Sequence, residues 1–184
     1  MSDRDRVRWD RRYTEREAVS DDEVGLPAVF QPFADTLPTA GRALDLACGR
    51  GGTAVWLARR GLQVRGYDVS PVAIAQARAL ADRVDLSARC RFDVADLDAG
   101  LPAGPQVDML LCNRFRDARL DQPIIERLSL GGLLAISVLS EVGASPGPFR
   151  VRRGELRRAF GGLDVIAEHE ADGEACLVAR RLGQ

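Results

Sequence analysis

Lysine is absent from this chain of 184 residues, in which all 26 cationic side chains are arginines, set against 27 acidic residues. This near balance of charge argues against nucleic acid as a partner, because proteins that neutralise phosphates carry a basic surface. Histidine occurs once, as His169. Since arginine keeps its proton in proteins, the chain has very few side chains for proton transfer and none for a lysine Schiff base.

The four cysteines are widely separated and form no C-x-x-C pair, which excludes the spacing of a zinc ribbon or a disulfide scaffold. No run approaches the roughly 20 apolar residues of a membrane span, and the first 17 residues alternate charges where a signal peptide needs an apolar stretch. The chain is therefore expected to be cytoplasmic, to bind neither a membrane nor a metal, and to be a monomer or a homodimer.

Apolar runs of strand length alternate with segments of helical periodicity from Ala40 onward. This alternation predicts a single α/β domain with a Rossmann-like, doubly wound, mostly parallel sheet of seven strands. Residues 1–38 form an arm and a helix over 26–37, and residues 40–184 form the core. The expected strands are 42–47, 62–67, 88–94, 106–112, 132–138, 163–168 and 175–179, and the expected helices are 53–60, 72–84, 120–130 and 154–160. The last two strands are joined by so short a turn that they must form an antiparallel hairpin.

A glycine turn follows the first expected strand, where doubly wound sheets bind their ligands. It reads Asp45-Leu-Ala-Cys-Gly49-Arg-Gly51-Gly52, and its glycines let the backbone approach a ligand closely. Asp68 ends the second strand, about 20 residues further on, where an acid accepts hydrogen bonds from ribose hydroxyls. The sequence therefore predicts a site for an adenosine-containing cofactor.

Two kinds of cofactor fit this turn, because Gly49, Gly51 and Ala54 also satisfy the looser dinucleotide fingerprint. Three features favour a different cofactor. The Asp45 carboxylate would repel a pyrophosphate but accept hydrogen bonds from a cationic amino group; about 40 residues precede the first strand, more than dinucleotide domains commonly have; and the third strand ends in Asp93-Val-Ala-Asp96-Leu97, which offers a carboxylate and an apolar side chain to an adenine.

These motifs resemble those of the class I S-adenosylmethionine-dependent methyltransferases. The matching segments are DLACGRGG, GYDVS, DVADLD and VDMLLCN, and WDRRY at 9–13 is similar to the N-terminal segment of the small tellurite-resistance and thiopurine-type enzymes. The resemblance implies S-adenosylmethionine as cofactor, methyl transfer as activity, and a set of cofactor-binding residues. In that set, the methionine portion is lined by Asp45, Ala47, Cys48, Gly49 and Gly51, the ribose by Asp68, the adenine by Val69, Asp96 and Leu97, and the far side of the cofactor by Asn113.

Trp9 and Tyr13 stand one helical turn apart in an otherwise charged segment, and we expect them to fold over the cofactor. The D/N-P-P-Y tetrad of amino-group methyltransferases is missing, since Cys112-Asn113-Arg114-Phe115 stands in its place. The residues that follow the fourth strand are candidates for the acceptor site. Arg114 and Phe115 are expected to bind the acceptor, and Arg116 is a further candidate for an anionic one.

Methyl transfer from a sulfonium needs positioning and exclusion of water more than covalent help, and no catalytic residue is assigned. The sequence predicts methyl transfer to a small-molecule nucleophile in one in-line displacement without a metal. Two alternatives remain open: an NAD-dependent oxidoreductase, and a catalytically silent cofactor-binding protein of the same fold.

Overall fold

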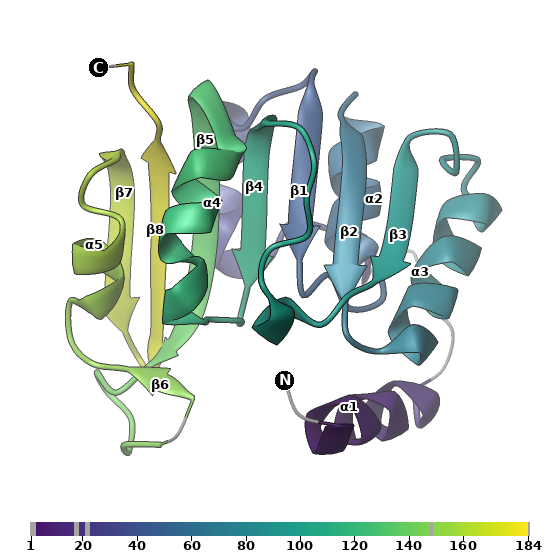
Figure 1. Ribbon diagram of the computed structural model, residues 1–184, viewed down its shortest axis with the longest axis horizontal. Coiled ribbons are helices and arrows are strands. Elements are labelled where there is room, and N and C mark those ends of the chain that lie inside the picture. Colours follow the sequence, from purple (N-terminus) through teal and green to yellow (C-terminus); the bar gives the residue numbers. More distant parts are fainter. Residues whose placement is uncertain (1–2, 17–18, 21–22, 148, 184) are drawn as a thin grey trace.

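The computed structural model describes residues 3–16, 19–20, 23–147 and 149–183. A single sheet organises the chain, with strand order β3-β2-β1-β4-β5-β8-β7 and β6 paired beside β5 (Figure 1). The strands are β1 Arg42–Leu46, β2 Gln63–Asp68, β3 Cys90–Val94, β4 Val107–Asn113, β5 Leu128–Ser140, β6 Arg150–Val151, β7 Asp164–Ala171 and β8 Glu174–Arg180. The strands from β1 to β6 pair in parallel, and β8 pairs antiparallel with both β5 and β7.

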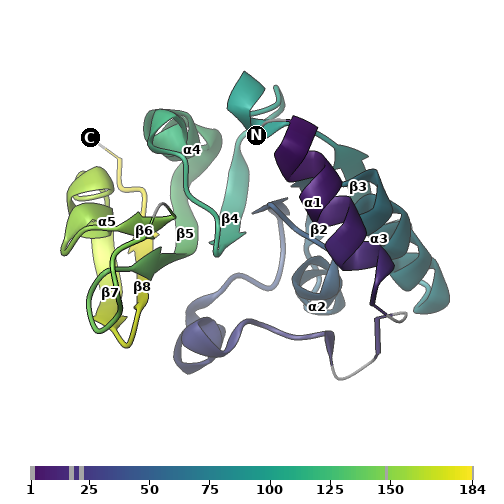
Figure 2. The same ribbon diagram turned by 90° about the horizontal axis from the view of Figure 1, so that it is seen from below.

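Two apolar cores lie on opposite faces of this sheet. On one face pack the helices α2 (Gly52–Arg59) and α3 (Pro71–Arg83) and the 3-10 helix η2 (Ala28–Thr36). On the other face pack α4 (Asp121–Arg127) and α5 (Glu155–Ala159), over β4, β5 and β8. Figure 2 shows α1 (Asp3–Thr14) lying along α3, near the carboxyl ends of the first strands.

The described residues confirm the predicted class of fold, its parallel order and its terminal hairpin. The helix expected over 26–37 is present as a 3-10 helix over residues 28–36, with Pro32 inside it, where proline cannot donate a helical hydrogen bond. The helix expected over 120–130 ends at Arg127, since β5 begins at Leu128. The two-residue strand β6 was not expected. Residues 1–2, 17–18 and 21–22 of the predicted arm lie outside the described residues.

The connection from β3 to β4 contains only one short 3-10 helix, η3 (Leu97–Ala99). In a doubly wound sheet a crossover helix normally covers this part of the face. Figure 1 shows the connection crossing in front of β1 and β4 as an extended loop, so β2 and β3 carry no helix on this side. The amino-terminal half of the sheet is thus layered with helices on one face only.

Gly66 provides a test of packing in the centre of the sheet. A Cβ atom there would lie 2.6 Å from Cδ1 of Phe92 and 2.9 Å from Sγ of Cys48. We expect Gly66→Ala to lower the free energy of unfolding by about 1–3 kcal/mol, because the core must shift to admit the methyl group. Urea denaturation measures the change. Gly162→Ala is the control, since its Cβ would meet nothing within 4 Å, and equal losses in both variants would contradict this packing.

Candidate cofactor site

The glycine turn after β1 is held in a left-handed conformation at three positions. Ala47, Gly49 and Gly51 have φ angles of 53°, 53° and 80°, and Gly51 precedes the first turn of α2. The turn is closed by a 3.1 Å hydrogen bond from the Gly51 N–H to the Cys48 carbonyl. A Cβ on Gly51 would lie 2.8 Å from Cβ of Ala77, so the glycine also permits α3 to pack closely against the turn.

Asp68 joins the ends of β1 and β2. Its carboxylate accepts hydrogen bonds of 2.9 Å from the backbone N–H of Gly49 and 2.9 Å from that of Ser70. Burial raises the pKa of Asp68, and these two backbone donors act in the opposite direction. The backbone N–H of Val69 also acts on this carboxylate, so the end of β2 surrounds Asp68 with backbone donors.

Asp45 is the most unusual polar group of the site. It lies within β1 and is 2% exposed, and among the described residues its Oδ2 has no hydrogen-bond partner. Burial, with a further contribution from Asp68, raises the pKa of Asp45 to about 8. Because an unpaired buried carboxyl is costly, its presence points to a ligand that supplies a donor or a positive charge.

Helix α1 lies over the glycine turn and is fastened there by polar contacts. The Tyr13 hydroxyl oxygen lies 3.0 Å from the point where a Cβ on Gly49 would stand. The Tyr13 carbonyl accepts a 3.1 Å hydrogen bond from the Gln76 side chain of α3, and the Ser70 hydroxyl donates to Asp10. The rings of Trp9 and Tyr13 stack with their centroids 5.8 Å apart. The structure thus places both predicted aromatics together, with Tyr13 directly at the turn.

Sequence reasoning missed Asp10, Ser70 and Gln76 as the residues that fasten α1. Ser70 is predictable only as the N-cap of α3, a role that the 3.1 Å hydrogen bond from Ala73 N–H to its hydroxyl confirms. Its second contact, with Asp10, spans 60 residues. No local sequence signal marks such a long-range pair.

Cys48, inside the turn, is a neutral thiol at neutral pH. Burial is the largest cause that raises the pKa of Cys48, and the nearby carboxyls of Asp45 and Asp68 add to it. Burial likewise raises the pKa values of Tyr13 and of Cys112. Cys112 is a buried residue near the end of β4. Neither thiol is therefore a ready nucleophile, in line with the sequence, which offers no histidine beside them.

The adenine side of the predicted site lies where β3 ends beside β2. The Ala95 N–H donates a 2.9 Å hydrogen bond to the Asp68 carbonyl, which brings the turn after β3 against the end of β2. Val69 and Leu97 are buried there. Asp96 is exposed and caps η3 by accepting a 2.9 Å hydrogen bond from the Asp98 N–H. The structure therefore brings the three predicted adenine contacts to the same edge of the sheet as Asp68.

Residues 113–116 turn away from β4 on the acceptor side. The Asn113 Oδ1 accepts a 2.6 Å hydrogen bond from the Ser137 hydroxyl of β5. Arg114 has a φ of 57°, and its exposed guanidinium lies 3.5 Å from a carboxylate oxygen of Glu174. Phe115 is half-buried and packs against the core beneath α4. Arg114 is therefore the residue of this turn whose cation faces solvent.

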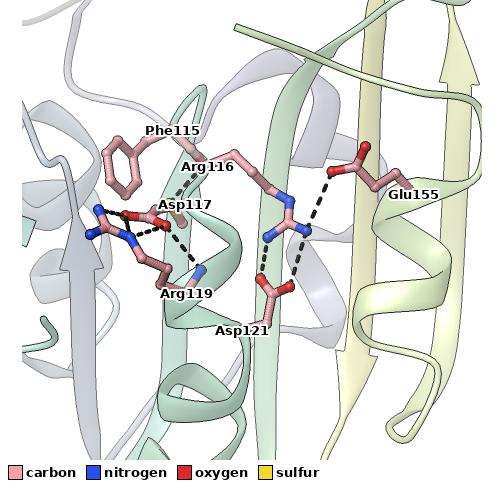
Figure 3. Close-up of polar contacts among 7 residues, drawn as sticks. Phe115, Arg116, Asp117, Arg119, Asp121 and Glu155 are labelled. Carbon is pink, nitrogen blue, oxygen red and sulfur yellow. Dashed lines mark hydrogen bonds and ion pairs between the residues drawn. The ribbon is translucent and has the colours of Figure 1, made fainter. Parts of the chain in front are cut away.

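Arg116 does not suit the acceptor role that its sequence position indicates. Figure 3 shows its guanidinium held by Asp121 and Glu155, with distances of 3.0 Å from Nη2 to Asp121 Oδ2 and 3.7 Å from Nη2 to Glu155 Oε1. It also lies 5.8 Å from the centre of the Phe160 ring. This cation joins α4 to α5, so it is already neutralised by the chain itself.

No group of three or more His, Cys, Asp or Glu side chains within the described ranges is arranged to hold a metal ion. His169 is exposed on β7, the last strand of the sheet, far along the strand order from β1. Among the helices that the structure describes, none is long and apolar enough to cross a membrane.

Comparison with protein families matches residues 43–128 to the family described as methyltransferase domain. This part of the chain is therefore similar to a methyltransferase domain. The matched segment runs from β1 through the glycine turn, Asp68 and Asp96 to the end of α4. This match and the doubly wound sheet agree with the class I S-adenosylmethionine-dependent methyltransferases that the motifs resemble, and with S-adenosylmethionine as the cofactor.

Individual relatives of this methyltransferase differ in what they act on. A curated relative, ribosomal RNA small subunit methyltransferase C from Alcanivorax borkumensis, is 38% identical over 80 residues, which are 43% of this chain and 23% of that protein. The chain thus spans about a quarter of that relative's length.

Solved structures resemble the methyltransferase in fold. TehB from Haemophilus influenzae has a TM-score of 0.72 and 19% identity, over 96% of this chain and 66% of that chain. An S-adenosylmethionine-dependent methyltransferase from Mesorhizobium loti has a TM-score of 0.72 and 20% identity, over 88% of this chain and 100% of that one. Geranyl diphosphate C-methyltransferase from Streptomyces coelicolor, solved with Mg2+, geranyl diphosphate and S-adenosyl-L-homocysteine, has a TM-score of 0.73 and 16% identity, over 96% and 97%.

The raised pKa of Asp45 predicts a pH-dependent stability. An aspartate in the unfolded chain has a pKa of about 3.9, against about 8 in the folded protein. Between these values the folded state keeps a proton that the unfolded state has released, so the stabilising contribution is complete below the lower pKa and is lost as the pH rises. The free energy of unfolding of the wild type, minus that of Asp45→Asn, should fall by about 1.4 kcal/mol per pH unit between about pH 5 and pH 7.

Urea denaturation of both proteins at several pH values measures this difference. All other titrating groups are shared by the two proteins and cancel. Parallel pH dependences of the wild type and Asp45→Asn would contradict a protonated Asp45 in the folded state.

Proposed function

We propose that this chain transfers a methyl group from S-adenosylmethionine to a small-molecule nucleophile, in one in-line displacement and without a metal. The observation that carries the proposal is the buried, unpaired Asp45 Oδ2 beside the glycine turn. A carboxyl with no internal donor suits the cationic amino group of the cofactor's methionine portion. A pyrophosphate would place further negative charge beside Asp45 and Asp68, which disfavours the NAD alternative.

The remaining residues of the site support the same cofactor. Asp68, at the end of β2 beside the glycine turn, would accept hydrogen bonds from the ribose hydroxyls. Ala47, Cys48 and Gly51 would line the methionine portion, and Asn113 the opposite side of the cofactor. Val69, Leu97 and Asp96 would receive the adenine, and Tyr13, with Trp9 stacked upon it, would cover the turn. When bound, S-adenosylmethionine supplies an electrophilic methyl group with a good leaving group.

The chain's own contribution to the reaction is positioning and exclusion of water. Burial raises the pKa values of Tyr13, Cys48 and Cys112, so these groups keep their protons at neutral pH. They are therefore poor general bases. We therefore propose that the acceptor is a nucleophile that needs no strong base, such as a thiolate or an oxyanion. Arg114 and Phe115 would contact it.

The acceptor is proposed to be small because the parts of the chain outside the sheet are short. In this proposal the 184 residues act as one domain. Residues 1–38 and the turn after β4 would select the acceptor. Geranyl diphosphate C-methyltransferase, solved with the small molecule geranyl diphosphate and similar in fold over most of the chain, supports this proposal. The ribosomal RNA methyltransferase relative shares only 80 residues with the chain.

Calorimetric titration with S-adenosylmethionine, S-adenosylhomocysteine and NADH tests the cofactor. We then expect a radiolabelled methyl group to reach one member of a panel that contains tellurite, thiopurines, simple thiols, phenols and carboxylates, with ribosomal RNA as a parallel arm. Binding of NADH alone would refute the proposal. Binding of S-adenosylhomocysteine with no transfer to any acceptor would favour the catalytically silent alternative, and transfer to RNA alone would refute a small acceptor.

Asp68→Asn tests the ribose contact. The variant removes the charge that would hold two hydroxyls, so we expect the dissociation constant for S-adenosylhomocysteine to rise at least about tenfold. Asp93→Asn is the matched control, because Asp93 lies near the end of the neighbouring strand and is partly exposed. An unchanged affinity in Asp68→Asn, with the fold intact by circular dichroism, would remove Asp68 from the site.

Arg114→Ala tests the acceptor side once the panel has identified an acceptor. We expect the KM for an anionic acceptor to rise about tenfold, while the affinity for S-adenosylhomocysteine stays unchanged. The matched control is Arg119→Ala, since Arg119 is exposed and paired with Asp117 (Figure 3). A parallel loss of acceptor and cofactor binding in Arg114→Ala would show that the two pockets are placed wrongly.

A further inference from the structure

A concavity of about 240 Å3 lies on the side of the sheet away from the cofactor site. Its lining comes mostly from the first residues of β1, β2 and β4, with Tyr67 reaching it from the far end of β2, whereas the glycine turn and Asp68 lie where β1 and β2 end. It opens on the face where no crossover helix covers β2 and β3, and the residues Gly104 and Pro105 of the β3–β4 connection form one wall. The missing helix thus leaves a hollow in a part of the molecule that the proposed methyl transfer does not use.

Arginine dominates this concavity. Five of its lining residues are arginines, and no carboxylate is among the described residues that line it. The five are Arg42, Arg65, Arg89, Arg91 and Arg127. Three come from β1, β2 and β3, Arg89 directly precedes β3, and Arg127 ends α4, so their gathering is a product of the fold and not of local sequence.

The strand register places these cations close together. Arg65 and Arg91 are direct partners in the parallel pairing of β2 with β3, and Arg42 is paired with Gln63, two residues before Arg65 on β2. Neighbouring strands lie about 4.8 Å apart, so at least two guanidinium groups start from adjacent backbone positions. Like charges directly opposite each other are destabilising, and an anion bound between them would relieve that repulsion.

Internal partners neutralise only part of this charge. Arg65 donates to Asp93 at 2.9 and 3.0 Å, and Asp93 also lies 3.8 Å from Arg78. Arg89 and Arg127 donate to backbone carbonyls, at 3.0 and 2.6 Å. Asp108 accepts from the backbone N–H of Arg42, not from its guanidinium, and its other oxygen accepts from Ser129. In the described part of the chain, the side chains of Arg42 and Arg91 have no carboxylate partner.

We propose that this concavity binds a compact phosphorylated small molecule. Guanidinium groups bind phosphate oxygens through two parallel hydrogen bonds, and several of them around one hollow suit an anion with more than one phosphoryl group. The volume is smaller than that of pockets for drug-sized ligands, and Asp93 borders the cations on β3. Both features favour a compact anion over an extended polyanion such as RNA.

Calorimetric titration of the full chain with pyrophosphate at low ionic strength tests the proposal. We expect binding of one pyrophosphate per chain, both in the absence and in the presence of saturating S-adenosylhomocysteine. Arg91→Gln should weaken binding at least about tenfold, and Arg42→Gln combined with Arg91→Gln should abolish it. Both side chains are exposed, so the variants should fold.

Arg59→Gln is the matched control, because Arg59 is an exposed arginine on α2, on the opposite face of the sheet. Tighter binding of ADP than of pyrophosphate would support the proposal and assign the ligand to the nucleotides. The proposal is overturned by absence of pyrophosphate binding, by equal losses in Arg91→Gln and Arg59→Gln, or by displacement with S-adenosylhomocysteine. It is also overturned if a single-stranded oligoribonucleotide binds more tightly than pyrophosphate in an Arg91-dependent manner, which would identify an RNA surface.

Discussion

The hydrogen bond from the Gly49 N–H to the Asp68 carboxylate is the interaction on which the candidate cofactor site depends. It fixes the turn after β1 to the end of β2, and the left-handed backbone at Gly49 and Gly51 makes that geometry possible. With the turn in this place, Asp45 is enclosed and Tyr13 of α1 can lie directly above it. Burial, with a further contribution from the neighbouring Asp68 carboxyl, raises the pKa of Asp45.

The order of elements was predictable because local signals agree with the fold. Apolar runs of strand length and helical periodicity mark the sheet and its crossovers, and Ser70 with Pro71 marks the start of α3. The turn from Asp45 to Gly51 was predictable for the same reason, since its glycines and acids lie within a few residues. The spacing of Trp9 and Tyr13 predicts that they cover the cofactor, and in the structure their rings stack, with Tyr13 at the glycine turn.

Features that arise between distant segments were not predictable. A local exception is the type of helix η2: the apolar spacing indicates a helix, and the proline in its middle favours the 3-10 form. Arg114 and Arg116 are equivalent as sequence, yet Arg114 faces solvent while Arg116 is enclosed by Asp121 and Glu155. The five arginines of the concavity are scattered between positions 42 and 127, and only the strand register brings them together.

Arginine as the sole long-chain cation fixes the positive charge of this protein across the whole range of pH in which its acids titrate. The formal charge of −1 at neutral pH counts Asp45 as ionised, but the folded protein keeps its proton there. A ligand ammonium group that pairs with Asp45 would take the place of that proton. Under the proposed function, loading the site would exchange one cation for another at the buried Asp45 carboxyl, the proton for the ammonium group.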